Sequence, residues 1–291
     1  MLAGVCGVVA AGCIGLVVFS VVYYKLPPID ALTEYRPKIP LRIYTADGDL
    51  IGEFGEERRE FVSIEEMPRH MRLAILAAED NGFYEHSGIE FMGIARAALS
   101  NILTGSRGQG GSTITMQVAR NFFLTSERSY VRKLYEVALA FKIEQNLTKD
   151  EIFEAYANQI FLGHRSYGFG SAAQTYFGKD LKDLSISEAA VLAGLPVAPS
   201  AYNPIVNMRR ATMRRNYVLG RMHTLGYIDD ITYSAAIAQP IELKKTTAEE
   251  RRTQLQTEDM QAGYIAELAR MMLLPYFKDT IYNQGLNVYT T

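Results

Sequence analysis

Cysteine is scarce in this sequence. Among 291 residues the only cysteines are Cys6 and Cys13, and both lie in the apolar stretch at the N-terminus, so the rest of the chain can form no disulfide within itself. Basic charge is not in excess either: 30 Lys and Arg stand against 32 Asp and Glu, without a basic tail, and no nucleic-acid partner is expected. The 4 histidines show no metal-ligand spacing, so no protein-held metal site is predicted.

Charged residues are also missing from a long apolar stretch, from Leu2 to Tyr24. At about 1.5 Å per residue, a helix of this length spans the roughly 30 Å hydrocarbon core of a bilayer. We therefore predict a transmembrane helix over residues 1–25. A cleaved signal peptide would need a basic start, a shorter apolar run and a small-residue cleavage site, and none is evident. Small residues recur at every fourth position of the stretch, which would allow two such helices to pair: Ala3, Gly7, Ala11 and Gly15.

Residues 26–60 are predicted to form a connector and a small β-hairpin. Two consecutive prolines end the membrane helix. Apolar residues then alternate from Arg42 to Phe54 around an Asp47-Gly48 step, which is typical of a hairpin turn.

The signals from residue 61 to residue 241 predict an all-α body. Helix boundaries are indicated by two capping boxes and a closing glycine: Thr148 with Glu151, Ser185 with Glu188, and Gly226. Apolar residues between Ile89 and Leu103 cover most of a helix surface. Two interpretations stay open for them: a core helix, or a segment in the membrane interface that would suit a lipid substrate.

The body is organised around a turn at Glu79 and Asp80. These two acids end an apolar helical run that starts at Met71, and an Asn-Gly step follows them. A carboxylate held on a rigid helix end can lie within hydrogen-bond reach of a bound hydroxyl and act as a general base. The alternative is a solvated helix end with a surface Glu-Asp pair.

Two later stretches carry polar groups that suit an anionic substrate. Gly110-Gly111-Ser112-Thr113 is predicted to begin a helix, whose free backbone N–H groups attract anions. In Arg132-Lys133-x-x-Glu136 the i,i+3 and i,i+4 spacings place three charges on one side of a helix. A surface salt bridge is the alternative interpretation of this second stretch.

These stretches, in this order, resemble the peptidoglycan glycosyltransferase (family 51) domain of class A penicillin-binding proteins, most closely the 1A type of Gram-negative bacteria. The motif Glu-Asp-x-x-Phe-x-x-His-x-Gly is matched by residues of this chain at every fixed position: Glu79, Asp80, Phe83, His86 and Gly88. The resemblance extends from about Ile43 to Ile241. It implies a mainly α, lysozyme-like helical domain with a small β-hairpin near its start.

The resemblance also implies an activity, the polymerisation of lipid II into glycan strands with release of undecaprenyl diphosphate. Glu79 would be the general base, and Glu136 a second catalytic carboxylate beside the diphosphate. The positions carried over as substrate-binding are Asp80, Phe83, His86, Gly111, Ser112, Thr113, Gln117, Arg120, Arg132, Lys133 and Asn158. A divalent cation, Mg or Mn, is expected at the diphosphate, and no organic cofactor is implied. Met116 stands where many relatives have a glutamine.

Residues 242–291 are predicted to be a linker, because in bifunctional penicillin-binding proteins a similar segment leads into the transpeptidase domain. No serine here has a lysine three residues later and no Lys-Thr-Gly occurs, so we expect a chain truncated before that domain. Two other functions share the same fold signals: a lysozyme-like or lytic transglycosylase that cuts glycan, and a non-catalytic membrane-anchored scaffold.

The implied location is the inner membrane, with one membrane-spanning helix and the catalytic domain in the periplasm. The expected partners are lipid II, the growing glycan strand and membrane lipids, with self-association through the membrane helix and other cell-wall synthesis proteins as further candidates.

Overall fold

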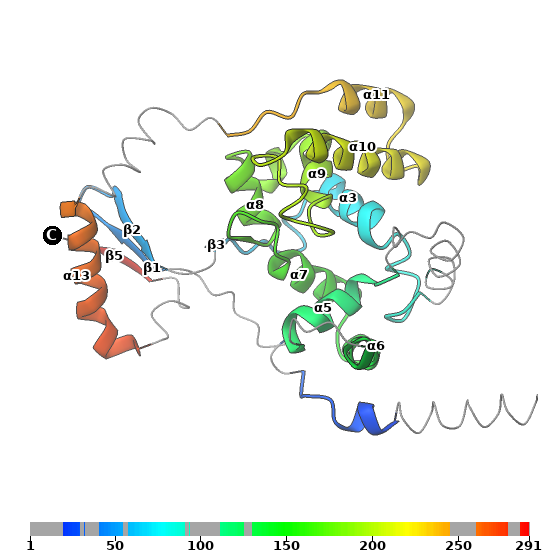
Figure 1. Cartoon of the computed structure of the whole chain (residues 1–291), viewed down its shortest axis with the longest axis horizontal. Coiled ribbons are helices and arrows are strands. Elements are labelled where there is room, and N and C mark those ends of the chain that lie inside the picture. Colours follow the sequence, from blue (N-terminus) through cyan, green and yellow to red (C-terminus); the bar gives the residue numbers. More distant parts are fainter. Residues whose placement is uncertain are drawn as a thin grey trace, which may run out of the picture. The chain divides into compact units, whose positions relative to one another are not determined.

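The structure is a computed structural model that describes residues 20–29, 32, 41–54, 58–90, 93, 111–124, 130–244, 260–278 and 286–290. Helices dominate this part of the chain (Figure 1), which confirms the predicted mainly α class. The chain divides into two compact units, Met1–Tyr35 with Glu79–Tyr156, and Arg36–Ala78 with Ala157–Thr291. Most of the predicted membrane span and of the 89–103 segment lies outside the described residues, and none of the described helices is long and apolar enough to cross a bilayer.

The first unit is built on helices α5 (Ile114–Phe123) and α6 (Tyr130–Glu144) and most of α7 (Lys149–Gln159). Thr113 caps α5, because its side chain accepts a hydrogen bond from the Met116 N–H. The predicted capping box at the start of α7 is confirmed: the Glu151 carboxylate accepts from the Thr148 N–H, and the Thr148 hydroxyl accepts from the Glu151 N–H.

An apolar cluster joins α5 to α6. Its buried members are Ile89, Met116 and Ala140, and Val137 and Phe141 pack against them. Met116, at the position where a glutamine is usual, is fully buried here. Its side chain therefore belongs to the core of this unit, where an amide would need hydrogen-bond partners that apolar neighbours cannot supply.

The second unit holds most of α3 (Arg69–Glu79) and a group of helices that follow α7 directly. These are α8 (Phe169–Tyr176), α9 (Ile186–Ala193), α10 (Met208–Thr224) and α11 (Asp230–Ala238), with a short 3-10 turn η1 (Leu181–Asp183). The capping box of Ser185 and Glu188 is confirmed, and Gly226, with φ of 71°, follows α10 as predicted. Two short strands, β3 (Arg58–Arg59) and β4 (Ser166–Tyr167), pair in parallel.

A three-stranded sheet also belongs to the second unit. Strands β1 (Leu41–Tyr44) and β2 (Leu50–Phe54) form the predicted antiparallel hairpin, and β5 (Asn287–Tyr289) pairs in parallel with β1. Helix α13 (Met260–Phe277) packs on this sheet (Figure 1), with Ala266 buried against Leu41 and Ile43. The stretch predicted to be a linker thus contains a helix and a strand that complete the hairpin's own core.

Gly52 shows how closely α13 lies on the sheet. A Cβ atom at this position would be 2.6 Å from the Ala266 Cβ, which is closer than two carbon atoms can approach. Only glycine therefore fits at this point of β2 unless the helix moves away.

Candidate active site

Glu79 is the last residue of α3 and is half-buried. The preceding turns of α3 are buried through Ile75, Leu76 and Ala77, which fixes the backbone that carries the carboxylate. From α5, the Gln117 amide Nε2 donates to the Glu79 Oε2 at 2.8 Å. One carboxylate oxygen is thus oriented by a neutral donor, as expected of a general base whose other oxygen receives a proton.

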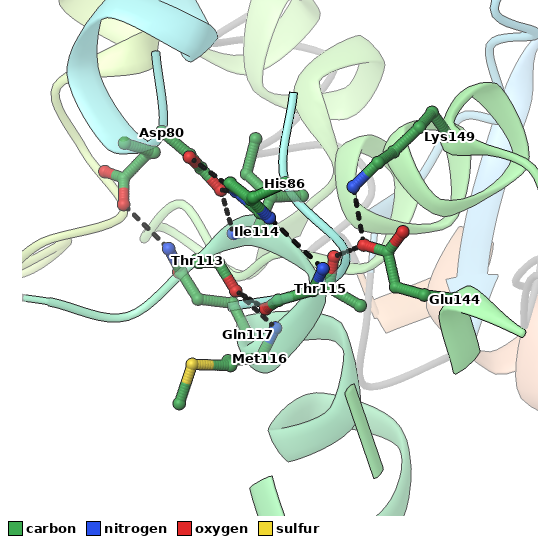
Figure 2. Close-up of polar contacts among 11 residues, drawn as sticks. Asp80, His86, Thr113, Ile114, Thr115, Met116, Gln117, Glu144 and Lys149 are labelled. Carbon is green, nitrogen blue, oxygen red and sulfur yellow. Dashed lines mark hydrogen bonds and ion pairs between the residues drawn. The ribbon is translucent and has the colours of Figure 1, made fainter. Parts of the chain in front are cut away.

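Asp80 connects the turn after α3 to the start of α5. Its carboxylate is only 5% exposed and accepts from the Ile114 N–H at 3.0 Å, and His86 Nε2 lies 3.1 Å from both its oxygens (Figure 2). The Gly88 N–H donates to His86 Nδ1 at 3.1 Å, so a neutral imidazole carries its proton on Nε2 and donates it to Asp80. The Glu79-Asp80 pair is therefore not a solvated helix end. Asp80 instead positions the turn that follows Glu79.

Thr113 belongs to the same hydrogen-bond network as Asp80 and His86. Its hydroxyl donates to the Gly88 carbonyl at 2.6 Å and also accepts the capping bond of α5. The structure thus brings together three residues that were predicted to bind substrate: Asp80, His86 and Thr113. Their contacts hold the 80–88 turn against the N-terminus of α5, and direct contact with substrate stays a prediction for each.

Phe83 is fully buried within this turn. Its ring lies 6.0 Å from that of Phe153 on α7, and the Lys149 ammonium lies 4.4 Å from its centroid. Lys149 in turn donates to Glu144 at 2.7 Å, and the same Glu144 oxygen accepts from the Thr115 hydroxyl at 2.5 Å (Figure 2). Neither Lys149 nor Glu144 stands out in the sequence, because both look like ordinary charges at helix ends.

Tyr156, which was not among the predicted site residues, is fully buried on α7. Burial raises the pKa of its hydroxyl well above the ordinary value, the charges of Glu79 and Asp80 raise the pKa further, and Arg120 lowers it. The phenol is therefore neutral, within electrostatic range of all three groups. In the sequence Tyr156 only continues the apolar face of Ile152 and Phe153, so nothing distinguished it from a core residue.

The predicted charged group on α6 is present and is anchored by a buried acid. Glu136 is 1% exposed, with Oε2 2.9 Å from Lys133 Nζ and Oε1 3.3 Å from Arg132 Nε. Lys133 also donates to the Ser112 hydroxyl at 2.8 Å, while its side chain stays 43% exposed. The surface salt bridge considered above does not describe this arrangement, because its carboxylate is withdrawn from solvent.

Asn158, another predicted substrate ligand, belongs to the second unit and contacts backbone there. Its Oδ1 accepts from the Val62 N–H and its Nδ2 donates to the Val62 carbonyl, both at 2.9 Å. Asn158→Ala is expected to lower the free energy of unfolding by roughly 1–3 kcal/mol, because two partly buried backbone groups lose their partner. Thermal and urea unfolding measure this loss. Asn158→Asp, which keeps the acceptor alone, should fall between, and an unchanged stability in Asn158→Ala would contradict the structural role.

The divalent cation that is expected at the diphosphate stays a prediction. Across the described ranges no three His, Cys, Asp or Glu side chains are grouped so that they could hold an ion. Glu136, which was expected to be a second catalytic carboxylate beside the diphosphate, has one side-chain cation on each oxygen. Its geometry therefore fits the arrangement of side-chain cations better than the ligation of a metal.

The Transglycosylase family model matches residues 47–223, which include every site residue named above. The chain belongs to this family, and its helical domain is a peptidoglycan glycosyltransferase domain, as the resemblance predicted.

Named relatives narrow the type. The chain is 48% identical over 280 residues to penicillin-binding protein 1A of Neisseria flavescens, covering 96% of this chain and 34% of that protein. It is 47% identical over 267 residues to penicillin-binding protein 1A of Pseudomonas aeruginosa, covering 92% and 32%. The crystal structure of penicillin-binding protein 1A from Haemophilus influenzae aligns with a TM-score of 0.52 at 32% identity, covering 87% of this chain and 27% of that one. The chain thus spans about a third of the length of these curated relatives.

Proposed function

We propose that this domain polymerises lipid II into glycan strands and releases undecaprenyl diphosphate, with Glu79 as the general base. One observation carries the proposal: the segment from Ser112 to Gln117 contacts the cationic group at one end and Glu79 at the other. Ser112 accepts from Lys133, and Gln117 donates to Glu79. A base and a cationic group are thus held by the same six-residue segment, as transfer from a diphosphate donor requires.

The reaction divides into two tasks for these groups. A hydroxyl oxygen of lipid II forms a bond to the anomeric carbon of the growing strand, while the bond from that carbon to the diphosphate oxygen breaks. Glu79 takes the hydroxyl proton. Lys133 and Arg132 neutralise the charge that develops on the departing undecaprenyl diphosphate, and Glu136 holds these cations in place.

The same cations argue against a glycan-cleaving enzyme. A lysozyme-like hydrolase or a lytic transglycosylase also needs an acid at a helix end, but it expels no diphosphate. A buried carboxylate that binds two cations would serve no step of such a reaction, and burying it is costly without a function. A silent scaffold would likewise have no use for the set.

The experiment is to incubate the detergent-solubilised chain with labelled lipid II and to resolve the products by size. A ladder of glycan polymer supports the proposal. Shortening of preformed glycan without any polymer from lipid II would support cleavage instead. Absence of both activities in a folded sample would favour the scaffold.

Lys133→Ala is expected to weaken use of the donor more than the chemical step, because the lysine binds the diphosphate in the ground state as well as in the transition state. The concentration of lipid II at half-maximal rate should rise about tenfold, with a smaller effect on the maximal rate. Lys182→Ala is the control, since Lys182 is 71% exposed and pairs with Asp180 at 3.6 Å in the other unit. An unchanged dependence on lipid II concentration would count against the assigned role of Lys133.

The apolar N-terminal run supports a membrane location for this domain. Residues Leu2–Tyr24 suit a single membrane span that keeps the domain beside its lipid-linked substrate. The family resemblance implies that the domain lies in the periplasm. Pairing of such spans through their small residues and contact with other cell-wall proteins belong to the same proposal. A divalent cation, Mg or Mn, at the diphosphate belongs to the same proposal.

A further inference from the structure

One ion pair outside the reacting groups joins α6 to α7. Glu144 is the last residue of α6 and Lys149 the first of α7, and their side chains are 9% and 20% exposed. The Glu144 Oε1 accepts from Lys149 Nζ at 2.7 Å and from Thr115 Oγ1 at 2.5 Å. A carboxylate this far removed from water is strongly oriented by its two donors.

Both partners of the pair also touch the turn that follows Glu79. The Lys149 ammonium lies 4.4 Å from the centre of the buried Phe83 ring, a cation–π contact made away from bulk solvent. Glu144 lies against Gly88, where a Cβ atom would come within 3.1 Å of the Glu144 Cγ. Gly88 has φ of 89°, so a larger residue would be both strained and crowded by the glutamate.

The Glu144–Lys149 pair therefore links the 80–88 turn to α5. The hydrogen bond between Gln117 and Glu79 joins the same two parts of the chain. Thr115 precedes Gln117 by two residues on α5, and Phe83 follows Glu79 by four residues in the turn. These same segments meet again where Gln117 donates to Glu79. Any shift of the turn along α5 would lengthen that bond, and the Glu144–Lys149 pair opposes such a shift.

We propose that Glu144 and Lys149 are positioning residues, which hold the 80–88 turn against α5 so that Gln117 orients the Glu79 carboxylate. The inference rests on the proposed role of Glu79 and adds a structural requirement for it. Neither residue touches substrate in this proposal. Their effect is on the geometry of the base, and small displacements of a catalytic group are known to cost up to about 100-fold in rate.

Lys149→Met removes the charge but keeps an apolar chain that can still cover Phe83. We expect the maximal rate of lipid II polymerisation to fall about 10- to 100-fold, with the half-saturating lipid II concentration changed less than about twofold. Lys149→Arg, which keeps the charge, should recover most of the rate. Thr115→Val removes only one donor to Glu144 and serves as a second test if Lys149→Met does not fold.

A matched control is available in the second unit. Lys179 and Glu188 form a pair with the same 2.7 Å separation and a carboxylate only 8% exposed, and Glu188 belongs to the capping box of α9. Lys179→Met should lower thermal stability by a comparable amount while leaving the polymerisation rate unchanged. Equal loss of rate in Lys149→Met and Lys179→Met would overturn the proposal, because it would reduce the effect to general destabilisation.

A readout that does not require activity separates this inference from the function on which it rests. The side-chain amide NMR signals of Gln117 report its bond to the Glu79 carboxylate. They should shift in Lys149→Met and stay in place in Lys179→Met. Unmoved signals in both variants would overturn the positioning role. Shifted signals with no polymer from the parent chain would instead keep the positioning and reject the glycosyltransferase assignment of Glu79.

Discussion

Glu79→Gln is expected to abolish glycan polymerisation while leaving the fold intact. The amide is almost the same size as the carboxylate and can still bond to Gln117, but it cannot accept the proton of the attacking hydroxyl. General base catalysis is worth about 10²–10⁴-fold, so the residual rate should fall below detection in a gel-based polymer assay. The measurement is the initial rate of conversion of labelled lipid II, with the melting temperature recorded on the same samples.

Glu85→Gln is the control for this substitution. Glu85 lies in the same turn but is exposed, so losing its charge should leave the rate within about twofold, as for most surface substitutions. Normal polymer yield from Glu79→Gln would refute the assigned base. Loss of activity in both variants would show that the turn as a whole, rather than one carboxylate, was disturbed.

Glu136→Gln should be nearly as damaging, by a different physical route. The buried carboxylate binds Lys133 through one oxygen and Arg132 near the other. A neutral amide in its place no longer balances the two positive charges. Its NH₂ group, which is a hydrogen-bond donor, cannot accept a bond from either cation. We expect the maximal rate to fall about 100-fold, similar to the loss of one group that stabilises charge in a transition state.

Glu188→Gln provides a comparison for Glu136→Gln. Glu188 is also buried and also bonded to a lysine, Lys179, but its other partner is the backbone at the start of α9. Its substitution should reduce stability without a specific effect on rate. The two variants are compared at the same fraction folded. If Glu136→Gln then loses only as much activity as Glu188→Gln, the Glu136 carboxylate has no role beyond packing.

Local signals in the sequence predicted the features that neighbouring residues decide. The hairpin around Asp47-Gly48, the two capping boxes and the charged face of α6 were all predicted because the residues involved lie within a few positions of one another. Each of these features depends on turn chemistry or helical spacing, which the sequence displays directly.

Long-range contacts were beyond the reach of the same signals. The bonds of Asp80 to Ile114 and of Thr115 to Glu144 join residues 34 and 29 positions apart, and no spacing rule connects such pairs. The family resemblance identified Asp80 and Thr113 as site residues. It did not reveal that Asp80 binds the start of α5, or that Thr113 binds the turn that follows Glu79. For Asn158 the resemblance predicted substrate binding. In the structure its side chain bonds to the backbone at Val62.

The parallel pairing of β5 with β1 constrains the order in which the protein can fold during its synthesis. Thr290 bonds to Tyr44 across a separation of 246 residues, so the sheet is incomplete until those residues have been made. At typical translation rates the delay is about 10–50 s. During this interval Leu41 and Ile43, later buried beneath α13, are without that helix and β1 without its parallel neighbour. The nascent hairpin therefore keeps these two apolar side chains exposed to solvent until α13 has been made.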